Sequence, residues 1–65
     1  MTLAEQIAAF EAKRAASFAR MNEVQSKAMD EGRSKDETEK AEFKTLSDQI
    51  KSIDDELIDL RMMEA

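Results

Sequence analysis

The chain has 65 residues, of which 38% are charged, and a formal net charge of −5. It has no His and no Cys, which excludes disulfides, the common zinc sites and catalysis by thiolate or imidazole. An acidic chain is a poor nucleic-acid module, because such modules need a basic face. No apolar stretch approaches the roughly 18 residues of a membrane span. We therefore expect a soluble, cytoplasmic protein that is not an enzyme and binds no cofactor or metal.

Helix-breaking residues are almost missing from the chain, which has no Pro and one Gly. Ala, Glu, Lys, Leu and Met are abundant, and all of them favour helix. The N-terminus lacks the basic and apolar regions of a signal peptide. The composition predicts an all-α fold.

The first predicted element is an amphipathic helix over residues 1–31. Thr2 is a plausible N-cap, with Glu5 three residues later completing a capping box. A stripe with alternating steps of three and four follows: Leu3, Ile7, Phe10, Arg14, Ser17, Met21, Val24 and Ala28. An eleven-residue spacing competes with it, since Phe18 lies eleven residues from both Ile7 and Met29. We expect Phe18 to take the buried place that Ser17 cannot fill, and this helix to have the less regular interface.

Arg14 occupies an otherwise apolar position of this stripe. Its stem could pack while its guanidinium reaches water, as long basic side chains often do. Alternatively, it could pair with an acid on another helix and set the register of packing. The sequence leaves both interpretations open.

Residues 32–36 are predicted to form a turn. Gly32 fits the left-handed position just past a helix end, because it has no Cβ. Two capping boxes then overlap, Ser34 with Glu37 and Asp36 with Glu39. We favour Asp36 as the N-cap, since it leaves a short loop typical of an antiparallel helical hairpin.

The second predicted helix covers residues 37–65 and carries a regular heptad seam, which consists of Phe43, Leu46, Ile50, Ile53, Leu57 and Leu60. The acidic run Asp54-Asp55-Glu56 could suggest a metal site, but consecutive helix positions point about 100° apart, which favours a solvated face. We interpret Met62 and Met63 as a fraying end. The pattern has no C-cap at Ala65, so we expect a fragment of a longer chain.

The fold prediction is an antiparallel two-helix hairpin of the coiled-coil type, self-associating into a helical bundle. A narrow seam on so short a chain needs further partners, because a core of this size supplies only about 3–5 kcal/mol. The residues predicted to form the self-association seam are Ile7, Phe10, Phe18, Met21, Phe43, Leu46, Ile50, Ile53, Leu57 and Leu60.

From Glu31 onward, about half of the chain resembles the N-terminal scaffolding (delta) domain of tailed-phage major capsid proteins of the Hong Kong 97 lineage. The residues that carry the resemblance are Glu31-Gly32-Arg33, Asp36, Glu37, Glu39, Phe43, Leu46, Ile50, Ile53 and Leu57. Lys35 departs from the pattern, because the family often has an apolar residue there.

The resemblance implies an internal scaffold for procapsid assembly. It would act in the host cytoplasm and inside the procapsid, with other capsid subunits as partners, and a maturation protease would later remove it. Two alternatives remain: a nucleic-acid-binding hairpin arm like that of seryl-tRNA synthetases, and a module that offers a helix to a protein partner.

Overall fold

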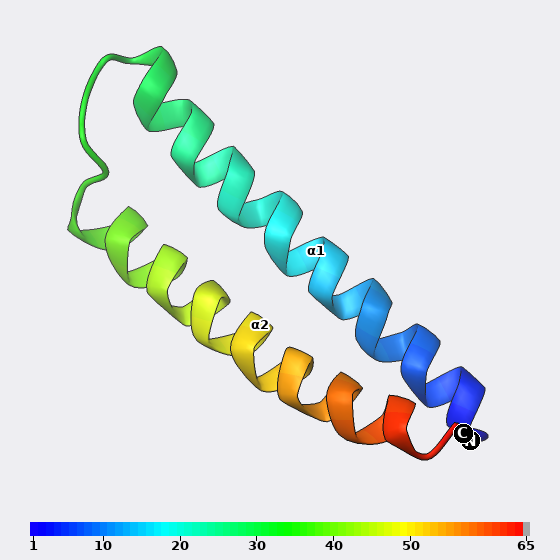
Figure 1. The fold of residues 1–65 in the computed structure, drawn as a ribbon. Helices are drawn as coiled ribbons and strands as arrows, with labels where there is room; N and C mark the ends of the chain where they lie inside the picture. Colours follow the sequence, from blue (N-terminus) through cyan, green and yellow to red (C-terminus); the bar gives the residue numbers. More distant parts are fainter. Residues whose placement is uncertain (65) are drawn as a thin grey trace.

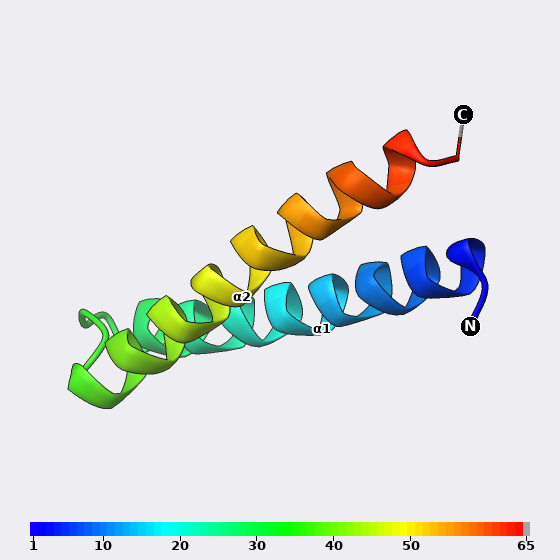
Figure 2. The same ribbon diagram turned by 90° about the horizontal axis from the view of Figure 1, so that it is seen from below.

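The computed structural model describes residues 1–64 and contains two helices, α1 (Leu3–Asp30) and α2 (Glu37–Met62). They pack side by side in opposite directions, so that both helices have their free ends at the end of the hairpin opposite the turn (Figure 1). Figure 1 shows the helices apart near the turn and close together near the chain ends, whereas Figure 2 shows them overlapping near the turn and apart near the chain ends. The direction from one helix to the other therefore turns along the hairpin, so the helices wrap around one another. The predicted all-α hairpin is confirmed.

Both helices begin at the predicted capping boxes. At α1 the Glu5 amide donates to Thr2 Oγ1 at 3.1 Å, while the Thr2 amide donates to Glu5 Oε1 at 3.0 Å. At α2 the Glu39 amide donates to Asp36 Oδ1 at 2.8 Å, and the Asp36 amide to Glu39 Oε1 at 3.0 Å. Each box satisfies backbone donors that the first turn of a helix leaves unpaired. The N-cap of α2 is Asp36, as favoured, and not Ser34.

Gly32 ends α1 with a φ of 63°, the left-handed conformation expected of it. The Arg33 amide donates to the carbonyl of Ala28 and the Gly32 amide to that of Met29, both at 3.0 Å. This pair of bonds is the Schellman motif, which satisfies carbonyls that the helix end would leave unpaired. A Cβ at Gly32 would meet nothing within 4 Å, so the backbone conformation alone favours glycine there.

The buried core lies mostly near the chain ends. Ile7 of α1 packs there with Ile53, Leu57 and Leu60 of α2, and the partly buried Leu3 and Phe10 border this cluster. Val24 and Ala28 are buried nearer the turn. The middle of α1 presents Arg14 and Ser17 instead, so the core is discontinuous along the hairpin. The less regular interface predicted for α1 has this origin.

The prediction that Phe18 replaces Ser17 inside the hairpin is wrong. Phe18 is 51% exposed and Met29 is 69% exposed, whereas Ser17 is half-buried. The heptad stripe therefore faces α2, whereas Phe18 and Met29, the residues that the eleven-residue spacing adds, do not. Because α2 carries a strict heptad seam, only a matching stripe on α1 stays in contact along the wrapped pair.

The second helix is shorter than predicted, since α2 ends at Met62. Met63 caps it, and the Met63 and Glu64 amides donate to the carbonyls of Leu60 and Arg61 at 3.1 and 3.2 Å. Such i→i+3 bonds are a common tightening of the last turn. The part of the prediction that falls on residue 65 lies outside the described residues.

Candidate self-association surface

Residues 1–64 hold no group of three or more His, Cys, Asp or Glu side chains placed to bind a metal ion. Asp54, the first residue of the acidic run, is engaged instead in an ion pair with Arg14. Within the same part of the chain, neither helix combines the length and apolarity needed to cross a membrane.

The predicted seam residues differ in how well the hairpin covers them. Ile7, Ile53, Leu57 and Leu60 are buried. The partly exposed members of the seam are Phe10, Met21, Phe43, Leu46 and Ile50. Phe18, also predicted as a seam residue, is exposed. Each helix thus covers only one side of the other, and the part of the seam between the turn and the buried cluster keeps apolar surface in contact with solvent.

The shape of the molecule accounts for this incomplete burial. Its extents are 47 × 17 × 15 Å, and its radius of gyration is 14.8 Å, against about 11 Å for a compact chain of this length. Its accessible surface of 4757 Å² exceeds the roughly 4200 Å² typical of a compact monomer of this mass. A second layer of helices would cover surface that two helices leave open.

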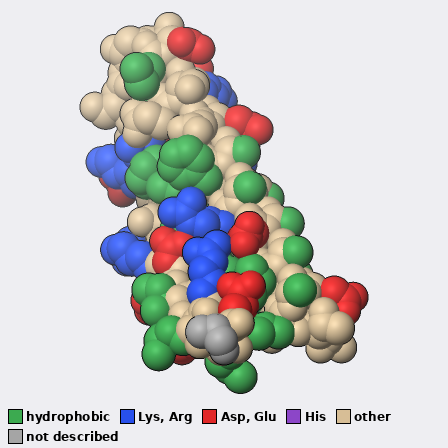
Figure 3. Space-filling view, turned by 45° about the vertical axis from the view of Figure 1, so that its right-hand side comes forward, with side chains coloured by type: hydrophobic (Ala, Val, Ile, Leu, Met, Phe, Trp, Pro, Cys, Tyr) green, Lys and Arg blue, Asp and Glu red, His purple; other side chains and the backbone are tan. Residues whose placement is uncertain are grey.

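Large apolar side chains are also exposed away from the contact between the two helices. Phe18 and Met29 lie on α1, and Ile58, at 60% exposed, lies on α2. Met1, Met62 and Met63 are exposed at the end of the hairpin opposite the turn. Figure 3 shows apolar side chains in green, one after another along the right-hand edge of the molecule, where α1 runs. These positions add apolar surface that further copies or partners can contact.

One long edge of the hairpin is closed by ion pairs between the helices. Arg14 Nε and Nη2 donate to Asp54 Oδ1 and Oδ2 at 2.6 and 3.4 Å, and Arg61 Nη2 donates to Glu11 Oε1 at 3.1 Å. Arg14 is thus half-exposed, as expected of a side chain that reaches water, and also paired with an acid of α2, as the second interpretation of the sequence expects. Its hydrogen bond lowers the pKa of Asp54 below the ordinary value. Whether Arg14 sets the register stays a prediction.

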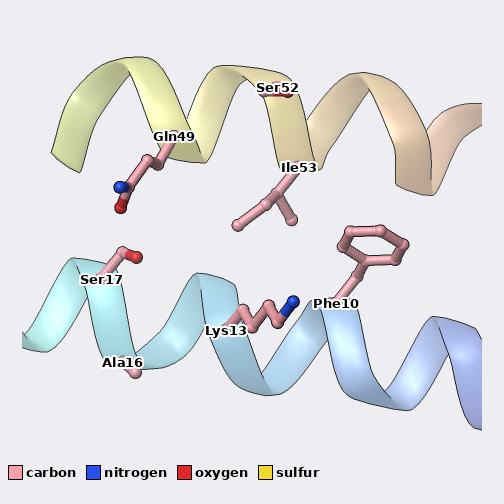
Figure 4. A pocket seen from close by; sticks show the side chains of 7 residues that line it. All are labelled: Phe10, Lys13, Ala16, Ser17, Gln49, Ser52 and Ile53. Atoms are coloured by element: carbon pink, nitrogen blue, oxygen red, sulfur yellow. The ribbon is translucent and has the colours of Figure 1, made fainter. Parts of the chain in front are cut away.

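The opposite edge, which we call the groove edge, is open in its middle, where one charged residue lines a groove. Phe10, Lys13, Ala16, Ser17, Gln49, Ser52 and Ile53 line a groove of about 480 Å³ there. Figure 4 shows Phe10 and Ile53 directed into the space between the helices, with Gln49 reaching down from α2. Lys13 lies along α1 with its ammonium 5.7 Å from the centre of the Phe10 ring. The groove exists because Ala16, Ser17 and Ser52 are too small to fill the space.

Toward the turn, the groove gives way to a charged pair. Arg20 Nε and Nη2 donate to the two carboxylate oxygens of Glu42 at 2.7 and 2.9 Å, and Nη1 donates to Glu23 at 3.1 Å. The hydrogen bond from Arg20 lowers the pKa of Glu42 below its usual range. Such a two-pronged contact fixes geometry as well as charge. It joins α1 to α2 between the groove and the turn.

Arg33 has a role that the sequence analysis missed. Its Nε donates to Glu31 at 3.0 Å, Nη1 to the Ser34 carbonyl at 3.1 Å, and Nη1 and Nη2 to the Glu39 carboxylate at 2.6 and 3.2 Å. One side chain therefore ties the end of α1 to the first turn of α2. Its signal in the sequence is an Arg placed two residues after one Glu and six before another.

The carboxylate of Glu39 accepts from both Arg33 and the Asp36 amide. These hydrogen bonds, that of Arg33 foremost, lower the pKa of Glu39 to about 2. Glu39, predicted as a capping residue, thus also anchors the turn.

Lys35 packs onto the first seam residue of α2 at the turn. Its ammonium lies 4.5 Å from the centre of the Phe43 ring and donates to Gln25 Oε1 at 2.7 Å. The half-buried side chain covers Phe43 as an apolar residue could, while its charge meets the face of an aromatic ring. Lys35 therefore packs against the turn through both its stem and its charge.

Comparisons with protein families, curated proteins and solved structures gave no match to this chain.

Proposed function

We propose that this hairpin is an assembly element that brings together several copies of the polypeptide that contains it. The observation that carries the proposal is the half-buried part of the seam between the turn and the buried cluster, where Phe43, Leu46 and Ile50 keep apolar surface exposed although they face α1. Removing such surface from water drives association at about 25 cal/mol per Å². The exposed side chains of Phe18 and Met29 increase the area available for contact.

We further propose that the assembly is a tailed-phage procapsid and that the hairpin is its internal scaffold. This finer role rests on the resemblance of Glu31-Gly32-Arg33 and of the seam that follows to capsid delta domains. A slender hairpin buries little area in each contact, so each contact is weak and reversible, while many linked copies gain avidity. Reversible contacts suit a scaffold of the host cytoplasm and the procapsid interior, from which a maturation protease later removes it.

The distribution of charge favours this proposal over a nucleic-acid arm. All four arginines are paired with carboxylates: Arg14 with Asp54, Arg20 with Glu42, Arg33 with Glu39 and Arg61 with Glu11. Phosphate binding would have to displace these acids from a chain that is already negative, whereas nucleic-acid binding depends on accessible positive charge.

The assembly role is tested by sedimentation of the purified hairpin over a range of concentrations. We expect a reversible oligomer for the native chain and loss of that oligomer for Ile50→Asp, because the new carboxylate would have to be desolvated in the contact. Asn22→Asp is the matched control: it adds the same charge at an exposed position of α1 and should leave the oligomer intact. A native chain that stays monomeric at every concentration would contradict the proposal.

The capsid role needs its own experiment, made in the polypeptide that contains the hairpin. Deletion of residues 1–65 should abolish procapsid assembly in electron micrographs and leave the capsid domain folded. Mass spectrometry of mature shells should find these residues removed. Normal procapsids from the deleted protein, or mature shells that retain the hairpin, would refute the scaffold role while leaving self-association standing.

A further inference from the structure

The two long edges of the hairpin differ in what they offer a partner. On one edge, Glu11, Arg14, Asp54 and Arg61 pair with one another across the helices. A partner docking there would have to remove these ion pairs from water, which opposes association. On the groove edge, the groove itself has apolar walls and a single charged lining residue, Lys13. The ion pair between Arg20 and Glu42 lies beyond the groove, toward the turn. Docking is therefore favoured on the groove edge.

The groove edge carries opposite charges on its two helices. On α1, Lys13 lines the groove and Lys27 follows two heptads later, which places it on the same side. On α2, Glu56 follows Ser52 by four residues and Gln49 by seven, so it lies on the side of those lining residues. Arg20, which also lies on this edge, is already paired with Glu42 and Glu23. The charges next to the groove itself are therefore positive on α1, from Lys13, and negative on α2, from Glu56.

Because one edge carries both signs of charge, a second copy of the same hairpin can complement it, and the charges decide how that copy is oriented. A second hairpin related by a two-fold axis parallel to the helices would lay its acidic α2 against the basic α1 of the first, and the reverse. A two-fold axis perpendicular to the helices would instead set α1 on α1 and α2 on α2. Lys13 would then face the basic helix of the other copy, and Glu56 would face its acidic helix. Like charges in a contact oppose association.

We propose that a second copy of this chain docks on the groove edge, with α1 of each copy antiparallel to α2 of the other. The result is an antiparallel four-helix bundle, in which the grooves formed by Phe10, Ala16, Ser52 and Ile53 of both copies are buried in the centre. Lys13 of one copy then lies near Glu56 of the other. This inference rests on the proposed function and specifies its first step, the pairing of two hairpins.

The absence of Cys from the chain permits a direct test by cross-linking. Hairpins carrying Ala16→Cys are mixed with hairpins carrying Ser52→Cys and oxidised, and the dimers are identified by mass. We expect the fraction of disulfide-linked dimers that contain one copy of each variant to be well above the fraction that random pairing would give. Ala15→Cys mixed with Ser52→Cys is the control, because Ala15 lines the opposite, ion-paired edge and should show no enrichment.

A charge exchange provides an independent measurement on the same contact. Lys13→Glu alone should weaken the dimer on the order of tenfold, because it replaces two symmetric ion pairs by repulsions. Adding Glu56→Lys in the same chain should restore most of the affinity. Circular dichroism of each variant checks that the hairpin itself stays helical.

The outcomes separate this inference from the proposed function. A dimer in which Ala16→Cys cross-links chiefly to itself, or in which the mixed pair does not exceed the Ala15 control, overturns the docking geometry and leaves self-association standing. Failure of Glu56→Lys to rescue Lys13→Glu also overturns it. A chain that sediments only as a monomer overturns both.

Discussion

Arg33 shows how one side chain can hold a turn that has almost no core of its own. The turn region contains Gly32, which tolerates positive φ, and Asp36, which starts the next helix, but neither of these joins the two helices. Arg33 does so through three carboxylate and carbonyl partners. Its planar guanidinium suits this task, because a lysine ammonium cannot make the same two-pronged contact.

The depressed pKa of Glu39 gives this contact a measurable pH dependence. The pKa is about 2 in the folded hairpin, against an ordinary value of 4.5. The stabilisation by Glu39 is therefore complete above about pH 4.5 and is lost as the pH falls from there toward 2. We expect Arg33→Gln to raise the pKa of Glu39 toward its ordinary value. A carboxyl NMR titration measures this; an unchanged midpoint in Arg33→Gln would show that the Asp36 amide alone sets the pKa.

At Gly32 we expect a valine to destabilise the hairpin by about 1–2 kcal/mol, because a β-branched residue tolerates the left-handed backbone badly. Space is not the reason, since a Cβ there would meet no atom within 4 Å. Thermal unfolding followed by circular dichroism measures the loss. Gly32→Asn is the control and should cost less, because Asn adopts positive φ more readily than Val. Equal losses for both variants would contradict the conformational argument.

At the scale of the helices, the structure could be predicted where local rules act alone. The caps at Thr2 and Asp36 and the end at Gly32 follow from backbone hydrogen bonding within a few residues, and each was predictable. Phe18 was not, because two spacings in α1 competed and the choice depended on the seam of the other helix. The contacts of Arg33 span six residues across the turn, and capping rules do not reach that far.

The same distinction between seam and surface predicts how neighbouring positions of α2 respond to truncation. Leu57 is 3% exposed and Ile58 is 60% exposed. Leu57→Ala should cost about 2–4 kcal/mol, because it removes buried surface and leaves a cavity. Ile58→Ala, the matched control one residue later, should change stability by less than about 0.5 kcal/mol. Urea unfolding measures both; similar losses would mean that α2 is rotated from the orientation described.

On the scale of the whole molecule, the candidate surface could be predicted only in part. The seam residues follow from the heptad pattern of α2, but which of its members a single hairpin leaves half-open depends on the three-dimensional fit. The open groove beside Ser17 and the ion pair of Arg14 arise from the same polar interruption of the α1 stripe. That interruption weakens the isolated hairpin and leaves an edge available to a partner.

A hairpin whose surface is completed by other copies should become more stable as its concentration rises, because association adds to the free energy of unfolding. Between about 10 μM and about 1 mM, we expect the melting temperature to rise on the order of 10 °C if the chain dimerises over that range. Ile50→Asp should show little dependence, since its added carboxylate opposes the contact. Circular dichroism at matched ellipticity, with the path length reduced as the concentration increases, makes the comparison. A melting temperature that is high and independent of concentration in the native chain would show that two helices suffice for stability, and the half-buried seam would then need another explanation.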